Sequence, residues 1–296
     1  MEPQQNEQTT KPSPARQADR DVASGAGLDS FRERSLKRGI NPFVYWTLRS
    51  ILVPTFLVYL RMQRIGREHL PKHGPLLLAS NHRSFLDPFV IGMLVRRPVY
   101  YMAKRELFEK RWQAWILNAL GAFPVDRGHG DAAAMDTARA ILQRGDCVVV
   151  FPEGTRVRRG PLRSPRRGIG RLALETGVPV APVAVFGSEH VRRGWRIRPR
   201  KVRVRVGRPM SFPTTGTSSP AIAAGVTERI WACVSLQWEW LGGQRAEDGA
   251  APSSTAASSA RRSHGERSHS SGVEREHERV GIGPTDATRG KESRAA

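Results

Sequence analysis

This sequence is poor in cysteine, in acidic residues and in long apolar runs. Its 296 residues include two cysteines, Cys147 and Cys233, and 27 acidic side chains against 48 basic ones. The two cysteines make neither a metal-ligand spacing nor a disulfide framework, which favours a reducing compartment. The polar N-terminus carries acids and no basic region leading into an apolar stretch, so we expect no secretory signal peptide.

Hydrophobic residues are also scarce at both ends of the chain. Residues 1–40 are rich in Gln, Ser, Pro, Asp and Arg, and residues 242–296 in Ser, Gly, Arg, Glu and His. Such segments cannot bury enough apolar surface to offset the entropy of ordering them. We therefore expect two disordered tails around one globular domain formed by residues 41–241.

The positive charge lies almost entirely in that middle part. The chain has a net charge of +21, whereas residues 1–40 and residues 241–296 each contribute only +1. An excess of this size implies a polyanionic partner: nucleic acid, anionic lipid or a phosphorylated substrate. A plainer interpretation is that an arginine-rich composition only confers solubility.

The most apolar segment is Pro42–Leu60. It approaches the length of a membrane-spanning helix, but Arg49 and Pro54 interrupt it, and a span needs about 20 apolar residues. We expect a helix lying in the membrane interface, with a core-packing helix and a true span as the alternatives. The arginines that follow are expected to reach lipid headgroups: Arg61, Arg64 and Arg67.

Short apolar segments alternate with amphipathic ones through the rest of the domain. The predicted strands are residues 75–79, 99–102, 122–125, 147–151, 178–186 and 202–206. The predicted helices are residues 85–95, 112–120, 131–143, 168–175 and 221–241. This alternation predicts an α/β domain with a mixed, largely buried β-sheet flanked by helices. There is no internal repeat, no glycine-rich dinucleotide fingerprint and no P-loop.

One histidine and one aspartate follow the first of these strands. His82 and Asp87 would lie about 140° apart on a straight helix, so they can meet only if His82 lies in the turn before the helix. Asp87 would then fix the imidazole tautomer and leave the other ring nitrogen to accept a proton. A lone histidine near an aspartate is more often structural. Ser84 is a possible nucleophile, but no G-x-S-x-G elbow surrounds it.

Two further motifs lie at predicted strand ends. Phe151-Pro-Glu-Gly-Thr-Arg156 follows a buried strand, and Gly121-Ala-Phe-Pro-Val-Asp-Arg127 contains another. Glycine lets a backbone approach a ligand closely, and arginine offers a planar fork for phosphate oxygens. Open α/β sheets bind ligands at the carboxyl ends of their strands. Either arginine alone is more often a surface charge.

Taken in order, N-H-x4-D, G-x-F-x-x-D-R, F-P-E-G-T-R and V-P-V-x-P-V resemble the glycerol-phosphate and 1-acylglycerol-3-phosphate (lysophosphatidate) acyltransferase family. The resemblance covers residues 70–206 and includes the segment of residues 101–108. It implies that His82 and Asp87 are the catalytic dyad. It also implies that five residues hold the acceptor's phosphate: Arg127, Glu153, Gly154, Thr155 and Arg156. Val157 and Arg167 depart from the usual Ser and Lys, which leaves the identity of the substrate open.

The resemblance implies transfer of a fatty-acyl group from acyl-CoA or acyl carrier protein to a lysophosphatidate-like acceptor, which makes phosphatidate in phospholipid biosynthesis. It implies no metal and no cofactor beyond the co-substrate, and an enzyme associated with the cytoplasmic face of an anionic membrane. Another lysolipid or glycolipid acceptor and a thioesterase remain alternatives. A cationic nucleic-acid or anionic-lipid binding module is a further one, resting on 16 basic residues against two acids in Arg156–Arg208. No nucleic-acid-binding signature accompanies that stretch, so we expect no nucleic-acid partner.

Overall fold

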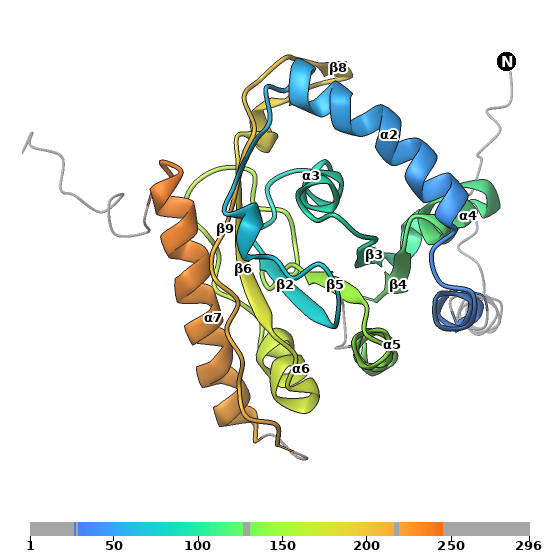
Figure 1. Ribbon diagram of the computed structural model, residues 1–296, viewed down its shortest axis with the longest axis vertical. Helices are drawn as coiled ribbons and strands as arrows, with labels where there is room; N and C mark the ends of the chain where they lie inside the picture. Colours follow the sequence, from blue (N-terminus) through green and yellow to red (C-terminus); the bar gives the residue numbers. More distant parts are fainter. Residues whose placement is uncertain (1–26, 28, 127–130, 216–218, 245–296) are drawn as a thin grey trace, which may run out of the picture. The chain divides into compact units, whose positions relative to one another are not determined.

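A seven-stranded β-sheet organises this computed structural model, which describes residues 27, 29–126, 131–215 and 219–244 (Figure 1). The strand order is β1-β9-β6-β2-β5-β3-β4. β6, β2, β5, β3 and β4 are parallel, β9 runs antiparallel to β6, and β1 pairs parallel with β9. The strands are β1 Gln63–Ile65, β2 Leu76–Ser80, β3 Tyr100–Lys104, β4 Ala122–Val125, β5 Cys147–Val150, β6 Val180–Phe186 and β9 Arg203–Val206. The predicted mixed sheet is confirmed.

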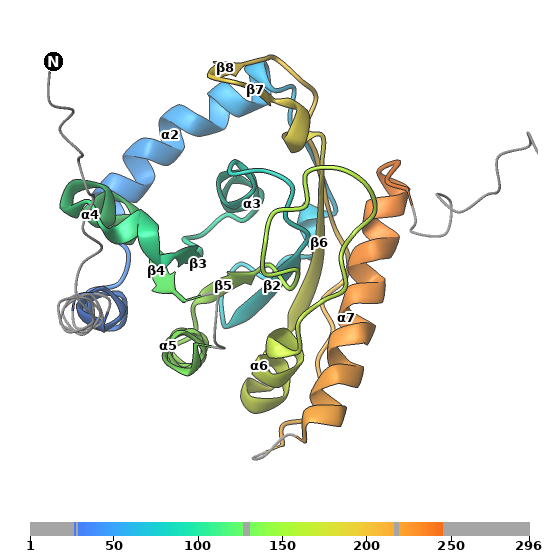
Figure 2. The same cartoon turned by 180° about the vertical axis from the view of Figure 1, so that it is seen from behind.

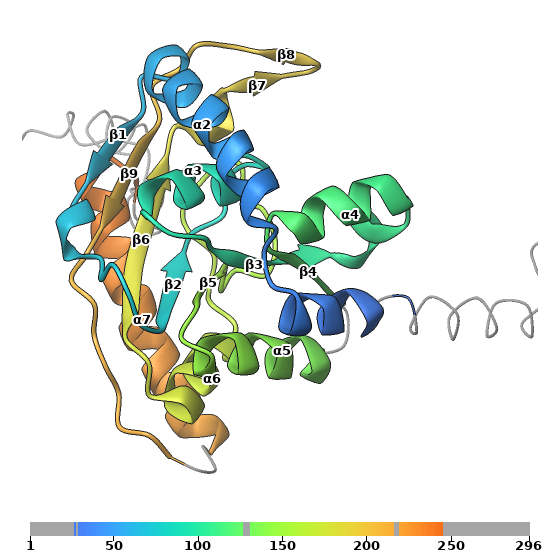
Figure 3. The same cartoon turned by 45° about the vertical axis from the view of Figure 1, so that its right-hand side comes forward.

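Helices cover both faces of the sheet. α2 (Pro42–Tyr59) and α3 (Asp87–Leu94) lie over one face, and α5 (Ala132–Gln143), α6 (Gly168–Thr176) and α7 (Pro220–Trp240) over the other (Figures 1 and 3). α4 (Arg111–Ala119) lies at one end of α2, and a hairpin of β7 (Arg192–Arg193) and β8 (Arg196–Ile197) lies at its other end (Figure 2). The described residues also include three short 3₁₀ turns: η1 Arg67–His69, η2 Arg105–Phe108 and η3 Ser188–His190.

The central strand β2 is buried on both sides. Leu76 and Leu78 pack with side chains of α2 and α3, whereas Leu77 and Ala79 pack with those of α5, α6 and α7. Every residue of β2 is buried. This two-sided burial accounts for an unbroken apolar sequence in place of an alternating one. Each strand and helix predicted between residues 75 and 241 is present with ends within two residues of the prediction.

The predicted N-terminal tail extends too far into the chain. Residues 29–37 form a helix, so the expectation of disorder up to residue 40 is wrong there. The ring of Phe31 lies 5.5 Å from that of Phe108, and Asn118 donates a hydrogen bond from Nδ2 to the Phe31 carbonyl (3.1 Å). These contacts anchor a segment that is too polar to be recognised from its sequence. Residues 1–26, 28 and 245–296 lie outside the described residues.

α2 begins and continues as local chemistry dictates. Asn41 caps its N-terminus by accepting a hydrogen bond from the Val44 amide (3.2 Å), and Pro42 occupies the first turn, where no amide donor is needed. Pro54 lies inside the helix without ending it. Within the described residues, no helix has the length and apolar content that crossing a membrane requires.

Three arginines close the C-terminus of α3. Arg49 donates to the carbonyls of Gly92 and Val95, Arg64 to Met93 (3.4 Å) and Arg67 to Leu94 (2.7 Å). The last carbonyls of a helix have no partner inside it and form its negative end, which attracts cations. Arg49 therefore turns inward instead of interrupting α2. Arg64 and Arg67, expected at lipid headgroups, each use one guanidinium nitrogen on α3, through Nη1 and Nε respectively, and their contact with headgroups stays a prediction.

Candidate active site

The sequence motifs converge at the carboxyl ends of the parallel strands. After β2 the chain turns onto the face covered by α3, and after β5 it turns onto the face covered by α6. The two loops diverge, and such a divergence is where open α/β sheets place ligands. The imidazole of His82, from the first loop, stacks on Phe151, from the second, with ring centroids 4.1 Å apart.

His82 and Asp87 meet as predicted. His82 Nδ1 lies 2.9 Å from Asp87 Oδ2, and both side chains are buried. Asp87 is the first residue of α3, and its Oδ2 also accepts hydrogen bonds from the amides of Arg83 (2.6 Å) and Ser84 (2.7 Å). Because a carboxylate oxygen can only accept a hydrogen bond, His82 Nδ1 carries the proton and donates to Asp87 Oδ2. Among the described residues none hydrogen-bonds Nε2, which is therefore available to a substrate.

Asp87 has one further partner that sequence reasoning missed. Ser188 Oγ donates to Asp87 Oδ1 over 2.5 Å, from the short η3 turn after β6. Ser188 is fully buried. Its only signal in the sequence is its place just beyond a strand that neighbours β2 in the sheet. Ser84, considered as a nucleophile, instead accepts a hydrogen bond at Oγ from the Leu86 amide (3.3 Å).

Asn81 fixes the histidine loop to the sheet. Its Nδ2 donates to the Val185 carbonyl (3.0 Å), and its Oδ1 accepts from the Val185 amide (2.8 Å). An amide side chain can replace a peptide group in this way because it carries the same donor and acceptor. The pairing of β2 with β6 thus continues one residue past the strand, up to His82.

Glu153 holds the main chain of the histidine instead of facing the cavity as an exposed ligand. Its Oε2 accepts from the His82 amide (2.7 Å) and its Oε1 from the Arg163 amide (3.0 Å). The Val157 amide donates to the His82 carbonyl (2.8 Å). Burial raises the pKa of Glu153, while the two amide hydrogen bonds act to lower it. Glu153 therefore positions the histidine loop, and the contact predicted between it and the acceptor's phosphate stays a prediction.

Of the remaining predicted binding residues, three lie in the same loop as Glu153 and one lies outside the described residues. Gly154 has a φ of +67°, and a Cβ there would come within 2.6 Å of Arg166 Nε, so any other residue would strain the backbone and displace the Arg166 side chain. Thr155 is partly exposed and Arg156 is exposed. Arg127 lies outside the described residues.

A cavity of about 240 Å³ opens beside His82. Apolar side chains form much of its wall, and His82, Asp126, Asp131 and Arg166 supply polar groups. A mainly apolar cavity with a few polar groups suits a ligand that is largely hydrocarbon. The apolar lining residues are Met102, Val125, Met135, Val150, Phe151, Pro152 and Ile169.

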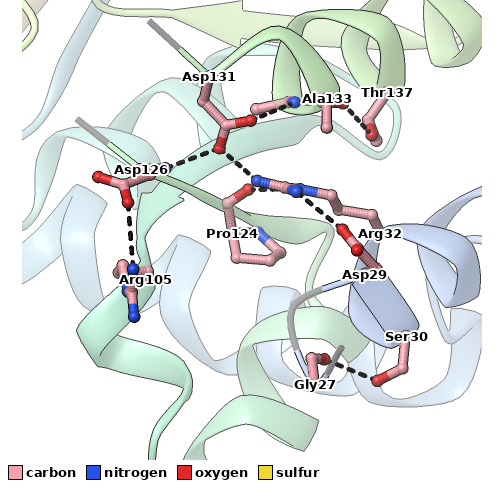
Figure 4. A network of polar contacts seen from close by, with 11 residues as sticks. Gly27, Asp29, Ser30, Arg32, Arg105, Pro124, Asp126, Asp131, Ala133 and Thr137 are labelled. Atoms are coloured by element: carbon pink, nitrogen blue, oxygen red, sulfur yellow. Dashed lines mark hydrogen bonds and ion pairs between the residues drawn. The ribbon is translucent and has the colours of Figure 1, made fainter. Parts of the chain in front are cut away.

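A polar network connects the N-terminal helix of residues 29–37 to the rim of this cavity (Figure 4). Asp131 caps α5 through the Ala134 amide (2.9 Å), and its other oxygen accepts from the Asp126 amide (2.8 Å) and from Arg32. Asp126 in turn pairs with Arg105 (3.1 Å). The helix missed in the sequence thus helps to fix two residues that line the cavity.

A buried arginine, Arg83, fixes the loop that follows β5. Arg83 is 1% exposed and donates to the carbonyls of Val157 and Gly160, each over 2.8 Å. Its guanidinium lies 4.2 Å from the centre of the Trp238 ring. Burial lowers the pKa of Arg83, although Glu189 and Glu153 act in the opposite direction. The arginine next to the histidine therefore fixes the loop that presents Arg156.

Comparison with known proteins agrees with this geometry. Residues 61–186 match the model of the Acyltransferase family. The chain is 30% identical over 151 residues to 1-acyl-sn-glycerol-3-phosphate acyltransferase of Bacillus subtilis, covering 49% of this chain and 71% of that protein. It is 32% identical over 201 residues to the alpha enzyme of that name from Mus musculus, covering 64% and 69%.

The fold also has a solved counterpart. The crystal structure of 1-acyl-sn-glycerophosphate acyltransferase from Thermotoga maritima aligns with a TM-score of 0.52 and 23% identity, over 77% of this chain and 98% of that one. The family match and the two relatives together define an acyltransferase. The chain belongs to the 1-acyl-sn-glycerol-3-phosphate acyltransferase family, as the resemblance of its motifs predicted.

Proposed function

We propose that this enzyme moves a fatty-acyl group from a thioester carrier to the free hydroxyl of a lysophosphatidate-like acceptor, which yields phosphatidate. One observation carries the mechanism: the buried hydrogen bond of 2.9 Å between His82 Nδ1 and Asp87 Oδ2. It sets the tautomer in which Nε2 carries a lone pair. The curated relatives carry the name of this activity, which supports the choice of acceptor.

The chemistry proceeds without a covalent enzyme intermediate. The acceptor hydroxyl gives its proton to His82 Nε2 while its oxygen attacks the thioester carbonyl. The tetrahedral intermediate then collapses, the C–S bond breaks, and His82 returns the proton to the departing thiolate. Asp87 stabilises the imidazolium between these steps, and general-base catalysis of this kind contributes about 10²–10⁴-fold.

Arginine side chains are proposed to hold the acceptor's phosphate. Arg156 is exposed in the loop that also fixes His82, so a phosphate bound there would lie near the base. Arg127, predicted for the same task, is the next residue in the sequence after Asp126, which lines the cavity, but it lies outside the described residues. Arginine suits this role because its planar fork matches two phosphate oxygens at once. The apolar cavity beside His82 is proposed to take hydrocarbon from an acyl chain.

We also propose that the enzyme works at the cytoplasmic face of an anionic membrane. α4 and the β7–β8 hairpin lie at the two ends of α2 (Figure 3). All three elements leave large apolar side chains exposed. Aromatic residues of this kind suit the interface between headgroups and acyl chains. The exposed residues are Phe43, Trp46, Ile51, Val58, Tyr59, Trp112, Trp115, Ile116, Trp195 and Ile197.

The hairpin places this surface near the dyad. It follows η3, whose Ser188 donates to Asp87, so the exposed Trp195 belongs to the same end of the sheet as His82. A lipid acceptor extracted into water would cost about 0.8 kcal/mol per exposed CH₂. Docking this surface on the bilayer avoids most of that cost.

Product analysis tests the proposal directly. Purified protein would be given a mixture of lysophosphatidate, glycerol-3-phosphate and other lysophospholipids, with acyl-CoA and acyl carrier protein thioesters in separate reactions. Mass spectrometry is expected to find phosphatidate as the main product. Equal thioester consumption with and without an acceptor would show a thioesterase and overturn the proposal. The two donor reactions decide which carrier is used.

A further inference from the structure

A second cavity, of about 400 Å³, lies at the opposite end of the strands from the dyad. Its wall is formed by η1 and the segment before β2, and by the turn between α3 and β3. These segments precede strands, so the cavity is at the amino ends of β2 and β3, whereas His82 follows the carboxyl end of β2. Nothing in the proposed chemistry uses this second cavity.

The charge of its lining is strongly positive. Four basic side chains face one acid, which gives the lining a net charge of +3. Within the described residues, none of these five side chains forms an ion pair. The charged lining residues are Arg67, Glu68, Lys72, Arg96 and Arg97.

The protein itself satisfies only part of this charge. The C-terminus of α3 attracts Arg67 through Nε, but Lys72 and Arg96 are exposed and make no hydrogen bond within the described part of the chain. Arg97 has two buried nitrogens, Nε and Nη2, without a partner. Burial lowers the pKa of Arg67, and the positive charges of Arg64 and Arg96 lower it further.

We infer that this cavity binds the phosphate group of an anionic ligand, with Arg67, Lys72 and Arg96 as its donors. Crowded cations repel one another, and a bound anion removes that repulsion while it gains charge-assisted hydrogen bonds. The volume falls in the range of small-molecule sites. Leu70 and Leu94 add an apolar wall. A phospholipid headgroup and a soluble phosphate ester both supply this chemistry.

Thermal unfolding in inorganic phosphate tests the site. All proteins would carry Arg127→Ala/Arg156→Ala, so that the two arginines proposed to hold the acceptor's phosphate do not contribute. In this background the test variant is Lys72→Glu/Arg96→Glu. The control is Arg159→Glu/Arg229→Glu, which makes the same charge change at two exposed arginines away from this cavity, one in the loop after β5 and one on α7. Chloride of equal ionic strength corrects for screening. Phosphate is expected to raise the Tm of the background and the control, and not that of the test variant.

Vesicle sedimentation distinguishes the two sources of phosphate. The same three proteins would be mixed with phosphatidylcholine vesicles with and without phosphatidic acid. If the ligand is a headgroup, the test variant alone loses the preference for phosphatidic acid. If it is a soluble phosphate, only the Tm response is lost. The inference is overturned if test and control variants behave alike in both measurements. Neither measurement depends on acyl transfer, so failure of this inference would leave the proposed function unaffected.

Discussion

At the scale of single residues, the main chain of His82 is fixed as firmly as its ring. Glu153 binds its amide, and the Val157 amide binds its carbonyl. The loop that is proposed to bind the acceptor thereby also positions the base. A glutamine at position 153 would present an NH₂ group to one of two amide donors, which leaves that donor unsatisfied.

Glu153 also gives stability a defined pH dependence. Its pKa is raised above the ordinary 4.5, so the folded state keeps this proton to higher pH than the unfolded state. Its contribution to stability therefore falls as pH rises from about 4.5 through the raised pKa. The unfolding free energy of the wild type minus that of Glu153→Gln is expected to decrease over this window, measured by urea unfolding. A difference that grows with pH would contradict the assignment.

Ser188 offers a test of how Asp87 is held. Ser188→Ala removes the hydrogen bond to Oδ1 while the bonds to Oδ2 remain. A hydrogen bond to a charged group contributes about 1.5 kcal/mol, so kcat is expected to fall about tenfold with little change in either KM. Ser50→Ala on α2, where the hydroxyl is exposed, serves as the control. Equal kcat values for the two variants would remove Ser188 from the account.

Arg156 is expected to act on acceptor binding. Arg156→Ala should raise the KM for a phosphorylated acceptor more than the KM for the acyl donor, because a lost charge-assisted hydrogen bond costs about 1.5–3 kcal/mol. Arg158→Ala, an exposed neighbour in the same loop, is the matched control. Steady-state kinetics with each substrate varied in turn gives both constants. A parallel rise in both KM values would assign Arg156 to the structure or to the carrier.

The sequence predicted the dyad but not its supports. His82 and Asp87 stand five apart within one motif, so their pairing could be inferred. Ser188 lies 101 residues from Asp87, and only the sheet order brings them together. Glu153 was recognised as part of a site, but which atoms its carboxylate meets depends on how two loops pack. Contacts set by tertiary structure leave no periodic signal in the chain.

At the scale of elements, apolar runs predicted the strands well, whereas the polar helix of residues 29–37 was not predicted. Residues 147–150 are all apolar because β5 is covered on both faces, and burial raises the pKa of Cys147 to about 12. Residues 29–37 instead depend on a few contacts such as that of Arg32 with Asp131. Arg49 was likewise misinterpreted from the sequence. It was taken to interrupt the apolar segment, because its bonds to carbonyls at the C-terminus of α3 can be seen only in the folded structure.

α2 provides the element-scale test of membrane docking. Phe43 and Val58 are each 79% exposed, so Phe43→Ser/Val58→Ser should leave the fold intact and weaken sedimentation with anionic vesicles. Ile222→Ser/Leu236→Ser is the control, since both side chains are exposed on α7, across the sheet from α2. Equal losses in the two variants would indicate general surface hydrophobicity. Full release of the wild type by salt alone would show that apolar contacts are not needed.

At the scale of the whole molecule, the excess of arginine has several separate uses. Arginines cap α3, hold the loop after β5 and stack on aromatic rings such as Trp238. The polyanionic partner expected from the charge stays a prediction, but these arginines have structural uses as well. The family match makes the protein an enzyme, and part of its charge has structural uses.

The central claim is that His82 is the general base. His82→Ala is expected to lower kcat by about 10²–10⁴-fold, while Asp87→Asn retains more activity because it disturbs orientation and leaves the base in place. Circular dichroism and Tm would confirm that both variants fold. Acyl transfer to lysophosphatidate at saturating substrate is the measurement. A folded His82→Ala protein with near-wild-type kcat would contradict the mechanism.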